Sequence, residues 1–153
     1  MAADGKWVSG LSADTPSDVA ARQVLAGRLG VVKHYLPLAA KTPDEDVEYV
    51  HQLRVATRRS GAALRIFGAL YPRKRLKLAK NVLRTVRRAA GGARDWDVFL
   101  EMLDGSDALR ASGSEAAVDF LTGYAFGHRA AAQEVLKDVA ASHGLLVDEL
   151  AKE

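Results

Sequence analysis

A stretch of 44 residues without a single carboxylate most constrains what this chain can fold into. Between His51 and Arg94 the sequence has 13 Arg or Lys residues and no Asp or Glu, whereas the rest holds 9 basic and all 19 acidic residues. Cations are costly to bury, so this stretch must fold with one side in water. Its apolar residues recur every three or four positions, which predicts amphipathic helices with a cationic face.

The same periodicity extends along the chain and predicts an all-α fold. No segment alternates between apolar and polar residues at period two, so no strand is expected. We predict an antiparallel four-helix bundle with long helices and a basic face. The helices are expected over about residues 17–38, 43–70, 73–90, 96–103 and 115–150, with a polar linker at 106–114.

Five short motifs set the expected helix ends. Thr15-Pro16 and Thr42-Pro43 are typical helix starts, in which the hydroxyl caps the first turn. Tyr71-Pro72 is expected to break the second helix, and Gly91-Gly92 to stop the third. Asp95 would then cap the short helix that follows.

Length and composition indicate one domain. A chain of 153 residues, 48% hydrophobic, can bury a core without disulfides or a structural metal. Residues 1–15, rich in Gly, Ser, Ala and Asp, are predicted to be a flexible lead-in to a single helical domain over 16–153. No cysteine is present, which excludes disulfides and thiolate metal sites. No apolar run could span a bilayer and no signal-like segment opens the chain, so a cytoplasmic location is expected.

The cations of the second and third helices lie opposite their apolar residues. At 100° per residue, the cations of the second helix fall within an arc of about 60° around the helix axis, and those of the third helix fall within about 100°. The second helix contributes His51, Arg54, Arg58 and Arg65, and the third contributes Arg73, Lys77, Lys80, Arg84, Arg87 and Arg88.

The short break between these helices makes them antiparallel neighbours. Measured back from the break at about 1.5 Å per residue, the cations fall at matching heights and form rungs. The predicted rungs are Arg65 with Lys77, Arg58 with Arg84, and Arg54 with Arg88, with His51 and Arg94 closing the far end.

Such a ladder fits a linear polyanion, because the planar guanidinium of arginine forks onto phosphate oxygens and keeps its charge. A single phosphate would need one nest or one helix N-terminus. His51 is open to two interpretations, a phosphate donor or an ordinary polar residue near a helix start. Asp95 and Asp97 are interpreted as caps, or as partners that hold Arg94 or another arginine in place.

Two segments resemble the signatures of the CHAD domain, the conserved histidine α-helical domain. They are VHQLRVATRRSGAALRIF at residues 50–67 and GGARDWDV at residues 91–98. The resemblance implies a domain that binds inorganic polyphosphate and associates with polyphosphate granules. It implies that the family's basic surface corresponds here to His51, Arg54, Arg58, Arg59, Arg65, Arg84, Arg88 and Arg94. Lys77 and Lys80 are added from the helical-face argument.

Two departures from the family pattern stand out. Typical members resemble two four-helix bundles with a basic channel between them, and this sequence corresponds to the N-terminal half alone. The chain is then either part of a longer protein, or it forms a homodimer that replaces the missing bundle. Ser60-Gly61 also stands where the family more often has a bulkier or basic pair.

Neither an enzyme nor a metal protein is expected. The sequence has no P-loop, no Gly-x-Ser-x-Gly elbow and no acidic cluster beside the basic stripe, so we predict no catalytic residue, metal site or cofactor. Sequence-nonspecific binding to the backbone of RNA or DNA is the main alternative, since the same arginines suit any phosphate backbone. A scaffold that meets an acidic protein, or another copy of this acid-rich chain, is the third.

Overall fold

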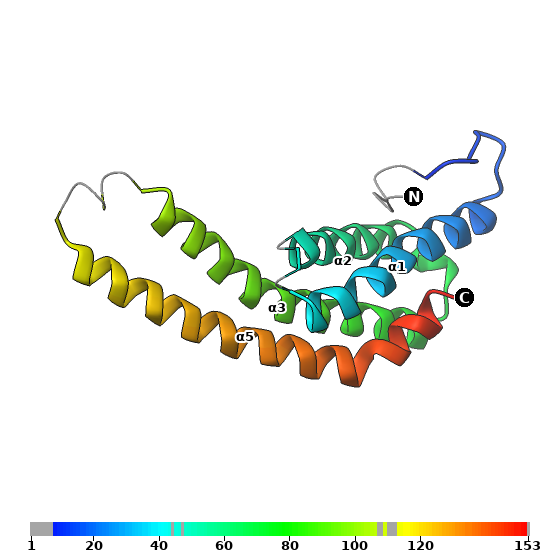
Figure 1. Cartoon of the computed structure of the whole chain (residues 1–153). Helices are drawn as coiled ribbons and strands as arrows, with labels where there is room; N and C mark the ends of the chain where they lie inside the picture. The colour runs from blue at the N-terminus through cyan, green and yellow to red at the C-terminus, as the bar shows by residue number, and fades with distance from the viewer. Residues whose placement is uncertain (1–7, 44, 47, 107–108, 110–112, 153) are drawn as a thin grey trace.

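The computed structural model describes residues 8–43, 45–46, 48–106, 109 and 113–152, and these fold into helices without a strand. The elements are α1 (Ser17–Lys41), α2 (Glu48–Ile66), the 3-10 turn η1 (Gly68–Leu70), α3 (Arg73–Asp104) and α5 (Glu115–Leu150). The all-α prediction is therefore confirmed (Figure 1). None of the helices in the described ranges combines the length and hydrophobicity that crossing a membrane requires.

The four long helices pack as a ring in which α1 contacts α2, α2 contacts α3, α3 contacts α5, and α5 returns to α1. Each helix contributes its apolar stripe to one core, and the most deeply buried side chains include Val32, Leu53, Val86 and Leu136. Buried Gln133 of α5 donates hydrogen bonds to the carbonyl oxygens of Ala39 and Ala40, at 2.8 and 3.0 Å. It thereby satisfies carbonyls that the end of α1 leaves without a helical partner.

The two Thr-Pro motifs do not start helices in the predicted way. Thr15 lies before α1, and its hydroxyl oxygen accepts the backbone N–H of Ser12 at 2.9 Å instead of capping the helix. Thr42 ends α1, because both its backbone N–H and its hydroxyl donate to the carbonyl of Leu38. α2 begins later, at Glu48, whose N–H donates to the carboxylate of Asp46 at 2.8 Å.

The predicted stop at Gly91-Gly92 is wrong, because α3 continues through both residues to Asp104. The separate helix over 96–103 is therefore part of α3, and Asp95 lies inside the helix instead of capping one. Packing overrides the weak helix propensity of glycine here. A Cβ at Gly91 would lie 3.7 Å from Nη1 of Arg54, and one at Gly92 would lie 3.7 Å from Cβ of Ala132, so neighbours on both sides enclose the helix.

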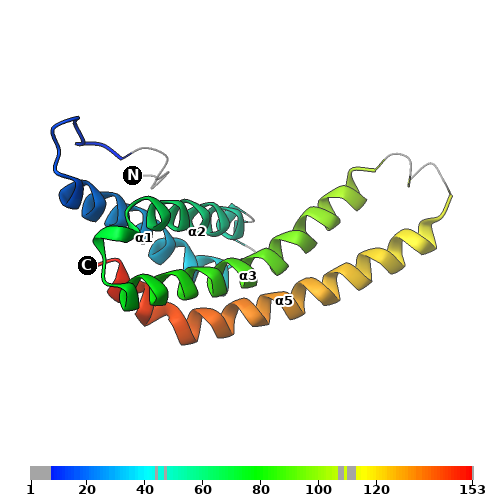
Figure 2. The same cartoon turned by 180° about the vertical axis from the view of Figure 1, so that it is seen from behind.

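The long α3 and α5 extend past the four-helix core and project from it as a pair, in both views (Figures 1 and 2). We call residues 94–104 and 115–131 the arm. The core cluster reaches only Ala93 on α3 and Ala132 on α5. Within the arm, Trp96 stacks on His128 with ring centroids 4.8 Å apart, and it forms a T-shaped pair with Phe99 with centroids 5.8 Å apart.

Two predicted segments fall partly or wholly outside the described residues. Residues 1–7 lie outside them, so the lead-in is described only from residue 8 onward. In this part, the side chain of Gln23 of α1 donates to the carbonyl oxygen of Ser9 at 2.6 Å. The linker at 106–114 is described only at its ends and at Leu109.

Candidate functional site

A groove runs between α2 and α3 and continues along α3 toward its N-terminus. It consists of three depressions of about 340, 280 and 540 Å³, which are adjacent because neighbouring ones share lining residues. The first and second share Lys80 and Arg84, and the second and third share Arg87. We call this the basic groove; its cationic lining is His51, Arg54, Arg58, Arg65, Arg73, Lys77, Lys80, Arg84, Arg87, Arg88 and Arg94.

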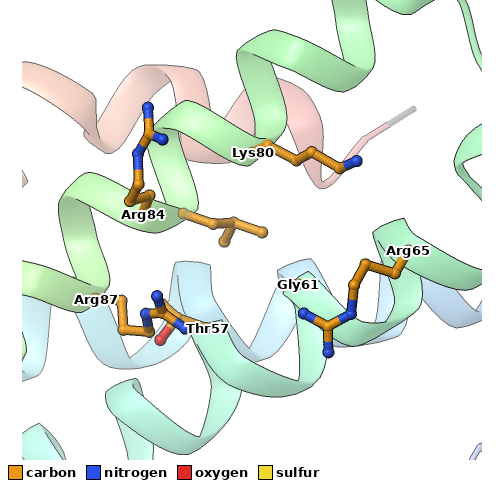
Figure 3. Close-up of a pocket in the computed structure, with 7 residues that line it drawn as sticks. Thr57, Gly61, Arg65, Lys80, Arg84 and Arg87 are labelled. Atoms are coloured by element: carbon orange, nitrogen blue, oxygen red, sulfur yellow. The ribbon is translucent and has the colours of Figure 1, made fainter.

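The middle depression shows how the two helices build the groove (Figure 3). Lys80, Arg84 and Arg87 come from α3, and Arg65 faces them from α2. Gly61 and the buried Thr57 line the space between them, and a Cβ at Gly61 would meet no atom within 4 Å. The middle of the groove is therefore open because α2 carries small residues there.

The cations of the two helices meet one helical turn away from the predicted rungs. Nη1 of Arg54 donates to the carbonyl oxygen of Gly91 at 3.3 Å, three residues beyond its predicted partner Arg88. The shift has the same direction at Arg65, which shares a depression with Lys80 and Arg84. Its predicted partner Lys77 lies in a depression lined by α3 alone. The structure therefore brings cations of both helices to one groove, with neighbours that are shifted by about one turn from the predicted rungs.

The shift arises in the connection between the helices. The predicted break at Tyr71-Pro72 is instead a longer connection, from Phe67 to Pro72, that contains the 3-10 turn η1. Gly68 in this turn is buried, and a Cβ there would come within 3.0 Å of the side chain of Leu76. This close packing fixes where α3 starts relative to α2. Heights measured from Tyr71-Pro72 at a constant rise per residue do not take this connection into account.

Nine of the ten predicted site residues line the basic groove, and Arg59 does not. Arg59 is half-buried and lies close enough to Arg28 of α1 for the two charges to repel. Burial lowers the pKa of the Arg28 guanidinium, and the positive charge of Arg59 lowers that pKa further. Only the family resemblance had suggested Arg59, whereas its angle on the helix places it away from the cationic face.

Two groove cations missing from the site set are Arg87 and Arg73. Arg87 lines both the middle and the largest depression, and Arg73 lines the one nearest the start of α3. Both lie on the cationic face that the helical spacing predicts. Helical spacing therefore indicates that both arginines belong to the groove, whereas the family motif does not include them.

Among the described residues, carboxylates form ion pairs with groove cations only at the end of the groove near Arg94. Arg54 donates to Asp95 at 2.9 Å, and Arg94 donates to Glu101 at 3.0 Å. Asp95 is thus a partner that holds an arginine, as one of the two interpretations had it, while Asp97 binds Arg129 of α5 at 2.7 Å. The interpretation as caps fails for both residues, because they lie inside α3, whereas the interpretation as arginine partners is confirmed for both.

The remaining groove cations have no such compensation. Within the described part of the chain, no carboxylate forms an ion pair with Arg58, Arg65, Lys77, Lys80, Arg84, Arg87 or Arg88, all of which are exposed. Arg84 donates instead to the side-chain oxygen of Asn81 at 2.8 Å. Like charges this close raise a strong positive potential, which an anion from outside would neutralise.

The groove offers cations and little else. Its described lining residues include no Phe, Tyr or Trp, so His51 is the one aromatic ring among them on which a nucleobase could stack. In the described ranges, no three His, Asp or Glu side chains gather in a way that could hold a metal ion. Chemically, the arrangement can bind and orient phosphate oxygens along a line.

Comparison with known proteins gives one match. Residues 23–151 match the sequence profile of the CHAD domain, which covers nearly the whole chain. No curated protein and no solved structure matches it.

Proposed function

The chain belongs to the CHAD domain family, and from that premise we propose that it binds inorganic polyphosphate along the basic groove without catalysing a reaction. CHAD domains are linked in general to polyphosphate binding and are typically binding domains. The observation that carries the proposal is the row of groove cations from Arg73 to Arg88 that have no carboxylate partner among the described residues. Association with polyphosphate granules follows from the same proposal.

The dimensions of the groove favour a chain of phosphates over a single one. Arg73 and Arg94 lie 21 residues apart on one helix, which corresponds to about 30 Å at 1.5 Å per residue. A free phosphate would contact only a small part of this length. A linear polymer can contact each depression in turn, and every additional charge-assisted hydrogen bond adds to its affinity.

The lining favours a polymer without bases. A protein that binds single-stranded nucleic acid usually adds aromatic stacking to phosphate contacts, at about 1–3 kcal/mol per base. The groove has no Phe, Tyr or Trp among its described lining residues, His51 is its single aromatic ring, and the amide oxygen of Asn81 is engaged by Arg84. Nucleic acid would therefore bind mainly through its backbone, so we test the proposal by competition with nucleic acid.

The experiment measures the affinity for long-chain polyphosphate and for RNA of equal total charge. Arg58→Glu and Arg84→Glu should each weaken polyphosphate binding by about 10- to 100-fold, because each removes one charge-assisted contact and adds repulsion. Arg22→Glu is the matched control, since it reverses the same charge at an exposed position of α1 that does not line the groove. It should change the affinity by less than about threefold.

Three outcomes would contradict the proposal. Normal binding by Arg84→Glu would place the polymer elsewhere, and equal losses in Arg84→Glu and Arg22→Glu would indicate attraction to the net charge alone. A clear preference for RNA would favour the alternative. Affinity should also fall steeply between 50 and 200 mM salt, by about 10³ or more if six contacts are made.

A further inference from the structure

The largest depression of the basic groove differs from the others in how it is built. Both helices line it, and its basic residues come in equal numbers from α2 and α3. α2 contributes His51, Arg54 and Arg58, and α3 contributes Arg87, Arg88 and Arg94. Asp95 is the one carboxylate among its described lining residues, so basic groups outnumber acids and the depression has a strongly positive potential.

Two of these arginines are held in place by the fold. Nη1 of Arg54 donates to the carbonyl oxygen of Gly91 at 3.3 Å, which ties α2 to α3 at this level. Arg94 donates to Glu101 at 3.0 Å, and its side chain is only 17% exposed. A guanidinium that is already fixed loses less conformational entropy on binding an anion than a free side chain does. The depression is therefore pre-organised to receive an anionic group.

The groove also ends in this depression. Beyond Arg94, α3 continues to Asp104 without another Lys or Arg, and the apolar Val98 lines the depression on this side. On α2, no Lys or Arg precedes His51 within the helix. A polyanion that follows the groove therefore meets the last cations of both helices here.

The opposite end of the groove is open. The depression that contains Arg73 is lined by α3 alone, and no described residue of α2 contributes to it. Two of its cations are the exposed Lys77 and Lys80, which carry point charges on flexible stems. A polymer can be attracted to this end, but the protein contacts only one side of it. The two ends of the groove therefore differ, because one is built by two helices and the other by a single helix.

A linear polyphosphate contains two kinds of phosphate group that this difference can separate. An internal group has a single negative charge and two free oxygens, because its other two oxygens are bridges. A terminal group resembles a phosphate monoester, which carries nearly two charges at pH 7 and has three acceptor oxygens. It can therefore bind more guanidinium groups at once than an internal group can.

We propose that the largest depression binds the terminal phosphate of the polymer, and that the rest of the polymer follows the groove toward Arg73. This inference rests on the proposed function and adds a direction to it. Polyphosphate has the same group at both ends, so either end can enter the depression. The protein then recognises a chain end, and for an equal number of phosphates short polymers offer it more ends than long ones.

The test compares two matched ligands by isothermal titration calorimetry with the whole protein. One is a linear polyphosphate of uniform length, just long enough to follow the groove once. The other is the same polymer with both terminal groups converted to methyl phosphoramidates, which removes one charge and one free oxygen from each end and leaves the internal groups unchanged. We expect the capped polymer to bind about tenfold more weakly, because the terminal group loses charge-assisted hydrogen bonds.

Two exposed arginines of α3 provide a matched pair of variants. Of the three depressions, Arg88 lines only the largest, and Arg73 lines only the one at the open end. Arg88→Gln should reduce the ratio of the two affinities from about tenfold to about threefold or less, since the two changes act on the same contact. Arg73→Gln removes the same charge, so it should weaken the binding of both polymers and keep the ratio near tenfold.

A further variant tests the same site from the other helix. Arg58 of α2 is exposed and, of the three depressions, also lines only the largest. Arg58→Gln should therefore reduce the ratio as Arg88→Gln does. Circular dichroism checks that each variant is helical, and the ratio itself is insensitive to the fraction of active protein because both ligands are measured on one preparation.

The ratio separates this inference from the proposed function. Equal affinity for free and capped polymer, with binding still weakened by Arg84→Glu, would overturn the terminal site and leave binding along the groove intact. Equal falls of the ratio in Arg73→Gln and Arg88→Gln would also overturn it, because the two ends of the groove would then be equivalent. If neither polymer bound, the proposed function would fail together with this inference.

Discussion

The two halves of α3 use charged residues in different ways. Before Gly91, Arg84, Arg87 and Arg88 are exposed and have no carboxylate partner within the described part of the chain. After it, Arg94 binds Glu101, and Asp97 binds Arg129 of α5. The same residue types therefore line the proposed binding surface in one half and form ion pairs within the molecule in the other. The difference depends on whether the fold brings an opposite charge within reach.

The largest effect is expected where the ion pair is buried. Asp97 is 7% exposed and its carboxylate accepts from Nε of Arg129 at 2.7 Å. Arg129→Met leaves this charge without its arginine, so the free energy of unfolding should fall by about 3 kcal/mol. Urea denaturation followed by circular dichroism measures the loss. Polyphosphate affinity, measured below the unfolding transition, should remain unchanged.

A matched pair on the surface sharpens this contrast. Arg22 binds Asp18 on the exposed side of α1, where an ion pair contributes less than about 1 kcal/mol. Arg22→Met should therefore change stability little. If Arg129→Met cost no more than Arg22→Met, the arm would not depend on its buried pair and the comparison between the two halves would fail.

A smaller effect is expected when the groove is filled without any change in charge. Gly61 lies in the middle depression with free space around it, so Gly61→Leu fits the helix and projects a side chain into the groove. Leucine also favours helix over glycine by about 0.5–1 kcal/mol, so stability should not suffer. We expect polyphosphate affinity to fall about fivefold, as measured by fluorescence anisotropy of a labelled polymer. Unchanged affinity would mean that the polymer is attracted to the molecule without entering the groove.

The smallest effect is expected at the far end of the groove, where the two kinds of charge meet. Asp95 is the carboxylate that lines the largest depression, and it holds Arg54 at 2.9 Å. Asp95→Asn removes a repulsive charge from the ligand's path and releases Arg54, so polyphosphate should bind about two- to threefold more tightly. The same anisotropy assay measures it. Weaker binding would show that Asp95 is needed to position Arg54.

How far the sequence predicts the fold can be judged from the glycines and prolines. The apolar periodicity predicted all four long helices, and the start of α5 at Glu115 and its end at Leu150 agree with the prediction. Gly91-Gly92 was misinterpreted, because its local preference for a helix end is outweighed by packing against Arg54 and Ala132. Thr42-Pro43 was misinterpreted for a related reason: a hydroxyl that can start one helix can equally end the previous one.

The candidate site shows the same division. Helical spacing placed Arg58, Lys80 and Arg84 on one face, since the angle between residues of a helix is fixed by backbone geometry. The sequence could not give the height at which the two helices meet, because this depends on η1 and on the packing of Gly68 against Leu76.

By itself, the acid-free stretch determined that two amphipathic helices would each present cations to water, because burying those charges without partners is too costly. Only the tertiary structure decided which cations face one another and which are neutralised by the chain's own acids. Ion pairs such as Arg54 with Asp95 and Asp97 with Arg129 join residues 41 and 32 positions apart, so they exist only once the helices have packed.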